Sequence, residues 1–457
     1  MTSSTAGAIE VPRHLEPLLS SPILPTLARL SVPNVLALTI QAMVAVAETV
    51  YIGILGTEPL AAMALVFPMI MLTQMMSSGA IGGGVSSAIS RALGAGDEAR
   101  ARALMVHAVV ISVVVGLGFT AFFLALGPAI YRLLGSQGGV FGQAITYSNV
   151  LFSGAVFIWS FNTLASIVRG TGDMRSSSAT VVGVAALQIA IGGCLSLGLA
   201  GFPRLGIAGV AIGQVTAFAA GSLFLLLLLR SGRLRLGLDF GGVSLERGMF
   251  LDILKVGAVS CLSPLQSVLT VLILSGFVAR FGTEALAGFG IGVRLEFLLV
   301  PIAFAIGVAS VPMVGMAIGA GNVERARRVA WTAGGLSAFI VGLVGAVAIV
   351  APDLWAALFT GNGQVKSATH LYLQTAGWGF APMGFGLAIY FASQGSGRMI
   401  GPVLAGTVRL LAVALGGLWL AAIGADEQSF FVLVAVAMLA YGLAMAAGLM
   451  MTRWKRA

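Results

Sequence analysis

The residue best suited to do chemistry in this chain is Glu48, an acid inside a long apolar run. A carboxylate at the centre of a bilayer costs about 2.5–3.5 kcal/mol, so it persists mostly where it faces a polar cavity. Gln41, seven residues earlier, and Tyr51, three residues later, share its face of a helix. Such an acid can be neutral or charged near neutral pH, which predicts a group that gains and loses a proton in use. The alternative is a permanently protonated, hydrogen-bonded structural glutamate.

Arg294 and Glu296 are charges of the same kind in the second half of the chain. Two residues apart on a helix, they project about 200° from one another and cannot pair. Glu296 is expected either to bind a cationic substrate or to form half of a structural ion pair. Arg409 lies in another apolar run, and the sequence supplies no obvious partner for it.

The composition indicates that these charges lie in a membrane protein. Of the 457 residues, 58% are hydrophobic and only 9% are charged, which no soluble protein of this length needs. The net charge of +9 is spread between the apolar runs. A surface that binds nucleic acid needs clustered basic residues, so we expect no such partner.

Twelve apolar runs have roughly the 20 residues that a bilayer-spanning helix needs. They are 33–54, 60–88, 103–127, 143–168, 177–200, 206–229, 253–279, 285–317, 329–351, 371–393, 401–423 and 430–452. Barrel strands would be shorter and would alternate polar with apolar residues. The predicted fold is therefore an all-α, multi-pass membrane protein with twelve transmembrane helices.

Three motifs occur twice, at a nearly constant offset. Leu55–Ala61 returns as Phe281–Ala287 (281 − 55 = 226), Leu93–Gly96 as Ile318–Gly321 (318 − 93 = 225), and Gly170–Met174 as Gly395–Met399 (395 − 170 = 225). The offset predicts two homologous halves. Six spans each is an even number, so the halves are parallel repeats. Glu48 belongs to one half only, because 48 + 226 falls on Leu274.

The basic residues predict the orientation in the membrane. With the N-terminus in the cytoplasm, one side holds Arg13, Arg29, Arg91, Arg100, Arg102, Arg169, Arg175, Arg230, Arg233, Arg235, Arg247, Lys255, Arg325, Arg327, Arg328, Arg398, Arg453, Lys455 and Arg456. The other side holds only Arg132, Arg204, Arg280 and Lys366. We therefore expect a cytoplasmic (inner) cell-membrane protein with both termini inside. Its parts would be a cytoplasmic segment 1–32, an N-lobe 33–229, a cytoplasmic linker 230–252 and a C-lobe 253–457.

Several motifs, taken in order, resemble those of the MATE (multidrug and toxic compound extrusion) family. They are Glu48–Gly53, Leu55–Thr57, Leu60–Ala62, Arg169–Asp173, Pro203–Gly209, and Gly319–Gly321 followed by Arg325–Arg327. The resemblance covers almost the whole chain. It implies a cation-coupled antiporter that expels amphipathic, usually cationic organic compounds by alternating access of two six-helix lobes.

The resemblance also implies site residues. The family usually has an Asp at the position of Glu48 and an Asn at that of Asn162. It often pairs an Asn with an Asp where this chain has Gln188 and Gly192, so the second carboxylate is missing. The expected cation-coupling and substrate site comprises Glu48, Gln41, Tyr51, Asn162 and Gln188. Pro33, at the start of the first run, removes a backbone hydrogen bond and predicts either a hinge or a plain helix entrance.

The same comparison bears on the coupling ion. Members with a cation site in the second lobe use acids where this chain has Met383 and Ser267, or nearby Gln266. A sodium site needs several oxygen ligands, ideally with more than one carboxylate. One carboxylate among amides and a phenol suits proton exchange better, so we expect the proton as the coupling ion and sodium less so.

Two other functions stay open at this point. A flippase for lipid-linked sugars, from the same superfamily, usually has fourteen spans and a strongly cationic cleft, which fits this chain less well. A dedicated exporter of one metabolite or siderophore has no distinguishing pattern. His107 and His370 lack metal-ligand spacing, and no nucleophile–base pair lies within the spans. We therefore expect a monomeric transporter without enzyme activity, metal or cofactor.

The charge bias gives a direct test of orientation. In a variant whose Cys194 and Cys261 are replaced by serine, a single cysteine at Gln364 should react with a membrane-impermeant maleimide on intact cells. A single cysteine at Gly242 should react only after the cells are opened. The reverse pattern would show that the chain is inserted the other way round.

Overall fold

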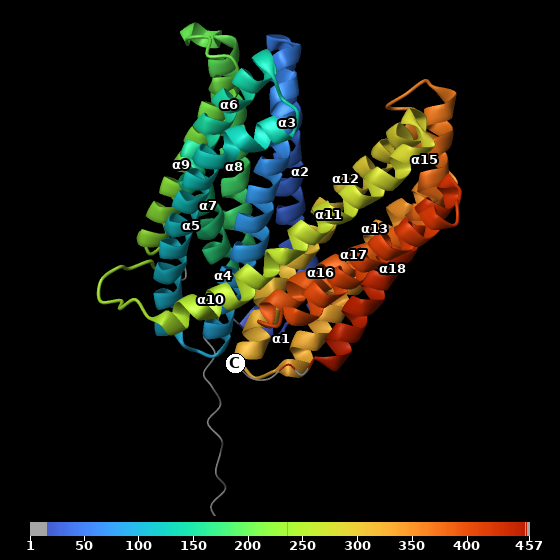
Figure 1. Cartoon of the computed structure of the whole chain (residues 1–457). Coiled ribbons are helices and arrows are strands. Elements are labelled where there is room, and N and C mark those ends of the chain that lie inside the picture. The colour runs from blue at the N-terminus through green and yellow to red at the C-terminus, as the bar shows by residue number, and fades with distance from the viewer. Residues whose placement is uncertain (1–15, 235, 453, 455–457) are drawn as a thin grey trace, which may run out of the picture. The chain divides into compact units, whose positions relative to one another are not determined.

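The structure is a computed structural model that describes residues 16–234, 236–452 and 454. Within these ranges the chain is almost entirely helical and has no strand (Figure 1). Helices suit a lipid solvent because each satisfies its backbone polar groups within its own segment. Five residues of the predicted basic side, namely Arg13, Arg235, Arg453, Lys455 and Arg456, lie outside the described ranges.

The helices follow one another along the chain with short connections. The first half contains α1 (Glu16–Ser20), α2 (Ile23–Leu55), α3 (Thr57–Gln74), the π-helix η1 (Met75–Ile81), α4 (Gly82–Gly94), α5 (Glu98–Leu133), α6 (Gly138–Ser153), α7 (Ala155–Gly170), α8 (Met174–Leu197), η2 (Leu199–Gly201) and α9 (Ile207–Arg230). The second half contains α10 (Arg247–Ser260), α11 (Leu262–Val278), η3 (Ala279–Phe281), α12 (Thr283–Gly319), α13 (Val323–Val350), α14 (Asp353–Ala356), α15 (Gly363–Ala376), η4 (Gly377–Gly379), α16 (Phe380–Gly395), α17 (Ile400–Ala422) and α18 (Glu427–Met451).

Eleven of the twelve predicted spans correspond to helices long and apolar enough to cross a membrane, once one of these spans is recognised as broken. In the described part of the chain, ten helices or helix series are long and apolar enough to cross a membrane. The pair α6 and α7, bent by 48°, adds an eleventh. At this bend a Cβ on Gly154 would lie 2.4 Å from the Val215 side chain, so only glycine fits. The series α15, η4 and α16 covers the remaining predicted span, 371–393.

Repeat-related glycines adopt the same backbone conformation in both halves. Gly56 and Gly282, which precede α3 and α12, have φ angles of 127° and 106°. Gly96 and Gly321 both have φ of 77°. Residues that carry a Cβ atom are disfavoured at these positive φ angles. The residue after each member of the second pair caps the next helix through its side-chain oxygen. The sequence repeat therefore encodes a repeated turn geometry.

Contacts divide the chain into two compact units. The N-unit comprises residues 36–93 and 97–257, and the C-unit comprises 258–457, 94–96 and the described residues up to Val35. The helix α2 therefore starts in the C-unit and continues into the N-unit. The first part of α10, up to Gly257, belongs to the N-unit.

Two arginines at repeat-related positions, Arg100 and Arg325, bind the segments with which the two halves of the chain begin. In the N-unit, Arg100 donates to Asp252 of α10 at 3.0 Å. In the C-unit its counterpart Arg325 donates to the backbone carbonyls of Leu18 at 3.0 Å and Ser21 at 2.8 Å. The start of each half is thus anchored by an arginine of the other half.

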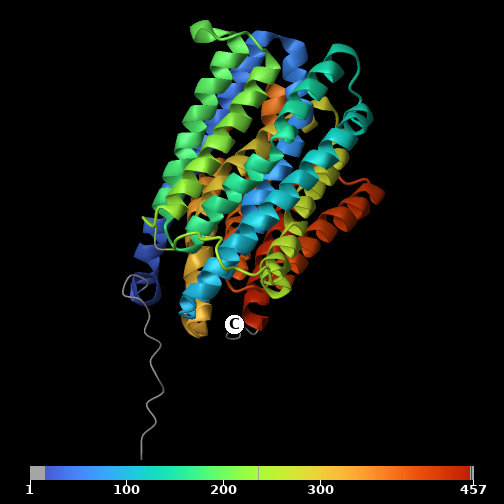
Figure 2. The ribbon, with the colours of Figure 1, turned by 90° about the vertical axis from the view of Figure 1, so that its left-hand side faces the viewer.

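Within the N-unit, α8 and α9 lie side by side in both views (Figure 1 and Figure 2). A Cβ on Gly213 of α9 would come within 2.4 Å of the backbone nitrogen of Gly192 of α8. Small residues permit such a close approach of two helices in a membrane. The contact fixes the part of α8 that carries Gln188, one turn before Gly192.

Within the C-unit, α17 packs against both α11 and α18. An apolar cluster includes Phe289, Tyr372 and Phe431, with the ring of Tyr372 set edge-on to both phenylalanines. Leu274, the repeat counterpart of Glu48, is a buried member of this cluster. The second half therefore has hydrophobic packing where the first half has an acid.

Candidate functional site

Glu48 lies on α2, where only 6% of its surface is exposed. Its Oε1 accepts a hydrogen bond from Nε2 of Gln188 on α8, at 2.7 Å. These residues are 140 positions apart in the sequence, and α8 is held in place by the close contact with α9. A hydrogen bond to a charged group contributes about 1.5–3 kcal/mol. Of the expected site residues, Gln188 is therefore the one that the structure brings into direct contact with Glu48.

Two tyrosines lie around this pair. Tyr51, half-buried on α2, packs on Gly193 of α8, where an added Cβ would lie 3.2 Å from its Cζ. Tyr147 of α6 is fully buried and close enough to interact electrostatically with the Glu48 carboxylate. Its hydroxyl has no hydrogen-bond partner among the described residues. Tyr147 was not among the predicted residues, because it stands in an apolar run without any motif around it.

Asn162 of α7 belongs to a different polar cluster. Its Nδ2 donates to Oε1 of Gln74 and to Oγ of Ser77, each at 2.8 Å. Ser77 lies in the π-helix η1, and such stretches frequently occur at functional sites. These hydrogen bonds join Asn162 to the α3–η1 segment and not to Glu48. Gln74 and Ser77 were not among the predicted residues.

The two remaining candidates on α2 are Gln41 and Pro33. Gln41 is half-buried, two turns before Glu48. Pro33 lies inside α2, ten residues after its first residue Ile23, and is not at the helix entrance. It stands three residues before Leu36, where α2 passes from the C-unit into the N-unit.

In the C-unit, Glu296 and Arg294 lie on different faces of α12. Glu296 is 7% exposed, and its carboxylate accepts a hydrogen bond from the hydroxyl of Tyr372. Arg294 is exposed, with its guanidinium carbon 5.6 Å from the centre of the Phe359 ring. Two residues apart, they therefore have separate partners.

The second-lobe positions Gln266, Ser267 and Met383 carry neutral side chains. Gln266 of α11 donates through Nε2 to Thr407 Oγ1 at 2.9 Å, and Met383 of α16 is buried. In the described ranges, no group of three or more His, Cys, Asp or Glu side chains could hold a metal ion. His107 Nε2 instead accepts the backbone N–H of Glu246 at 2.8 Å.

Comparison with known proteins identifies the family. The family model MatE matches residues 33–193 and 260–419, which together are well over half of the chain. The chain belongs to the MATE family. The predicted resemblance is therefore confirmed, and with it the MATE-like fold of two six-helix repeats.

Related MATE proteins are similar along most of their length. A FAD transporter of Shewanella oneidensis is 26% identical over 380 residues, which cover 82% of each chain. The probable multidrug resistance protein YoeA of Bacillus subtilis is 25% identical over 353 residues, 77% of this chain and 76% of its own. A MOP superfamily transporter from Pyrococcus furiosus has the same fold, with a TM-score of 0.87 at 24% identity over 96% of this chain and 97% of that one.

These similarities show the general function. The chain is a multi-span membrane transporter of the MATE family. The orientation of the termini stays a prediction.

The Glu48–Gln188 hydrogen bond can be tested by removing its donor. In Gln188→Leu the charged form of Glu48 loses this hydrogen bond and is destabilised by about 1.5–3 kcal/mol. Glu48 should then release its proton only at higher pH, and the pH profile of transport should move by at least about one unit to higher pH. Asn162→Ala, which cuts the bonds to Gln74 and Ser77, should leave the profile in place. Equal profiles for the wild type and Gln188→Leu would contradict the role assigned to this bond.

Proposed function

We propose that the chain is a proton-coupled antiporter that exports amphipathic, mostly cationic organic compounds by alternating access of its two lobes. The observation that supports this is a buried carboxylate of the N-unit, Glu48, whose hydrogen-bond partner is the amide of Gln188. Gln41 and Tyr51 complete the proposed coupling and binding site on the N-unit. We further propose that the transporter acts as a monomer in the cytoplasmic membrane with both termini inside.

The chemistry of the site favours the proton over sodium. A hard cation in a protein takes about six oxygen ligands, commonly including carboxylates. Glu48 instead receives an N–H donor from Gln188, which would repel a cation bound at the same oxygen. A carboxyl group removed from water is stable as the neutral acid, or as the anion beside a cation. An unpaired carboxylate there costs a large amount of free energy. Proton and cationic substrate are therefore alternative occupants of one group.

The transport cycle follows from this competition. Protonation of Glu48 from outside neutralises the site and releases the cationic substrate. Loss of the proton toward the cytoplasm restores the charge that binds the next substrate. The two states need α2 to adjust, and Pro33 is the proposed hinge because it interrupts the backbone hydrogen bonds inside that helix.

Asn162 and Glu296 receive different proposed roles. Asn162 would support the substrate cavity through the α3–η1 segment, since its amide is engaged there. The hydrogen bond that Glu296 receives from Tyr372 supports a structural role more than the binding of substrate cations. Arg294, exposed on α12, would contribute to the surface of the C-unit.

A second candidate function is the export of one particular metabolite. The FAD transporter of Shewanella oneidensis, similar over 82% of both chains, exemplifies a relative named for one compound. The two candidates differ in breadth, so a panel of chemically unrelated compounds separates them. A broad exporter moves many of them, and a dedicated exporter moves one.

The coupling ion can be tested in proteoliposomes with ethidium as the transported cation. An imposed pH gradient should drive ethidium transport without sodium, and a sodium gradient at equal pH should not. Glu48→Gln should abolish the coupled transport, because glutamine keeps the shape and cannot lose a proton. Glu48→Asp should retain part of it.

Glu58→Gln is the matched control, since Glu58 is an exposed acid of α3 in the same unit. It should transport like the wild type. Transport that follows the sodium gradient and ignores the pH gradient would contradict the proposal while leaving the family assignment intact.

A further inference from the structure

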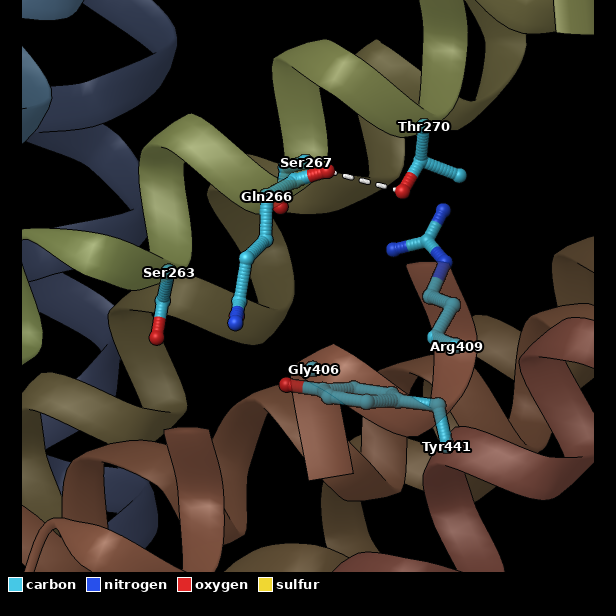
Figure 3. Close-up of a pocket in the computed structure, with 7 residues that line it drawn as sticks. All are labelled: Ser263, Gln266, Ser267, Thr270, Gly406, Arg409 and Tyr441. Carbon is cyan, nitrogen blue, oxygen red and sulfur yellow. Dashed lines mark hydrogen bonds between the residues drawn. The ribbon is translucent and has the colours of Figure 1, made fainter. Parts of the chain in front are cut away.

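A polar pocket opens inside the C-unit, and none of its lining residues belongs to the proposed coupling site (Figure 3). Its cavity volume is about 20 Å³, which admits a group about the size of one water molecule, and it is open on one side. Its wall includes Gln266, Ser267 and Thr270 of α11, Gly406 and Arg409 of α17, and Tyr441 of α18. The lining holds one cation and no anion. Hydroxyl groups and an amide make up most of the rest.

Arg409 is the charge of this pocket. It is half-buried near the middle of α17, and Figure 3 shows its guanidinium pointing toward Thr270. The guanidinium carbon lies 5.9 Å from the centre of the Tyr441 ring, which holds the side chain from α18. A guanidinium remains protonated in proteins, so the pocket carries a fixed positive charge.

This charge has no direct counter-ion in the described part of the chain. No ion pair within 4.0 Å involves Arg409 there, and its buried Nε has no hydrogen-bond partner. Glu296 of α12 is an acid of the same unit that interacts with Arg409 electrostatically, without an ion pair between them. The carboxylate of Glu296 is bonded instead to Tyr372. An ionisable residue inside a membrane segment that lacks a structural partner indicates a binding site.

The rest of the lining suits the same type of ligand. Gln266 donates through Nε2 to the backbone oxygen of Val403 and to Thr407, which leaves its Oε1 buried and without a partner. An added Cβ on Gly406 would collide with that oxygen, so glycine keeps the space open. A guanidinium in a pocket lined mostly by hydroxyl groups and an amide fits a carboxylate or phosphate group.

We infer that this pocket binds the carboxylate or phosphate group of a transported compound, with Arg409 as the anion-binding residue. Guanidinium groups recognise both acids through paired, charge-assisted hydrogen bonds. The inference rests on the proposed function, because it names a substrate class for the exporter: amphipathic zwitterions and organic anions in addition to simple cations.

The experiment uses two dyes that differ only in this charge. Rhodamine 110 carries a free carboxylate, and rhodamine 123 is its methyl ester. Their binding to the purified full-length chain in detergent is followed by fluorescence anisotropy. Arg409→Gln should weaken rhodamine 110 binding by about tenfold or more and leave rhodamine 123 within about twofold, since a charge-assisted hydrogen bond is lost for one dye only. Arg409→Lys should fall between the wild type and Arg409→Gln.

The control variant is Arg280→Gln, which removes an exposed positive charge of the same unit outside the pocket. It should bind both dyes like the wild type. Equal weakening of both dyes by Arg409→Gln, or no weakening, would overturn the inference. If Arg409→Gln does not fold, displacement from the wild type decides: phenyl phosphate should displace rhodamine 110, and failure to do so overturns the inference.

A lipid headgroup offers the same phosphate chemistry, so a second arm adds phosphatidylglycerol. Displacement of rhodamine 110 by this lipid but not by phenyl phosphate would overturn the assignment to a transported compound. Binding in detergent needs no ion gradient. A failed gradient experiment with Glu48 therefore leaves this test intact, and the reverse also holds.

Discussion

The central constraint on this structure is the free-energy cost of burying the Glu48 carboxylate among apolar helices. Glu48 is almost fully buried, and the amide of Gln188 is the group that stabilises it. That amide is in place because α8 and α9 approach closely at Gly192 and Gly213. The carboxylate cannot remain charged and alone in such a place, so it is driven to take up either a proton or a cation. The proposed antiport is a direct consequence of this constraint.

The two halves share a fold and differ in their charges. The counterpart of Glu48 is Leu274, which packs in the apolar cluster of the C-unit. Conversely, Arg409 corresponds to Val184 (409 − 225 = 184), and an offset of 226 places Glu296 on Ile70. Each half thus has the repeated turn, at Gly56 in the first half and at Gly282 in the second, and carries its own ionisable groups. In this account the first half handles the proton, and the second contributes a positively charged pocket.

The fold could be predicted from sequence because it depends on local and repeated features. Apolar runs of sufficient length predict the spans, and the duplicated Gly-Thr-Glu and Gly-Ala-Gly motifs predict two homologous halves. The φ angle of 77° at both Gly96 and Gly321 agrees with that duplication. The bend between α6 and α7 was not foreseen, because it depends on the approach of Val215 to Gly154 from a distant helix.

The site could be predicted only in part. Glu48 stands out because an acid in an apolar run is rare. The pairing of Asn162 with Gln74 spans 88 residues of sequence, and the approach of Tyr147 to Glu48 spans three helices. Such contacts follow from helix packing, and no spacing within one helix encodes them. For the same reason the sequence showed Arg409 without a partner but could not show the pocket around it.

The most direct test of the account is whether substrate binding displaces a proton from Glu48. Ethidium is added to the purified chain in weakly buffered detergent solution near neutral pH, and a pH indicator reports released protons. We expect release of up to about one proton per bound ethidium from the wild type, and none from Glu48→Gln. Equal proton release from the wild type and the variant would contradict the assignment of the exchange to Glu48.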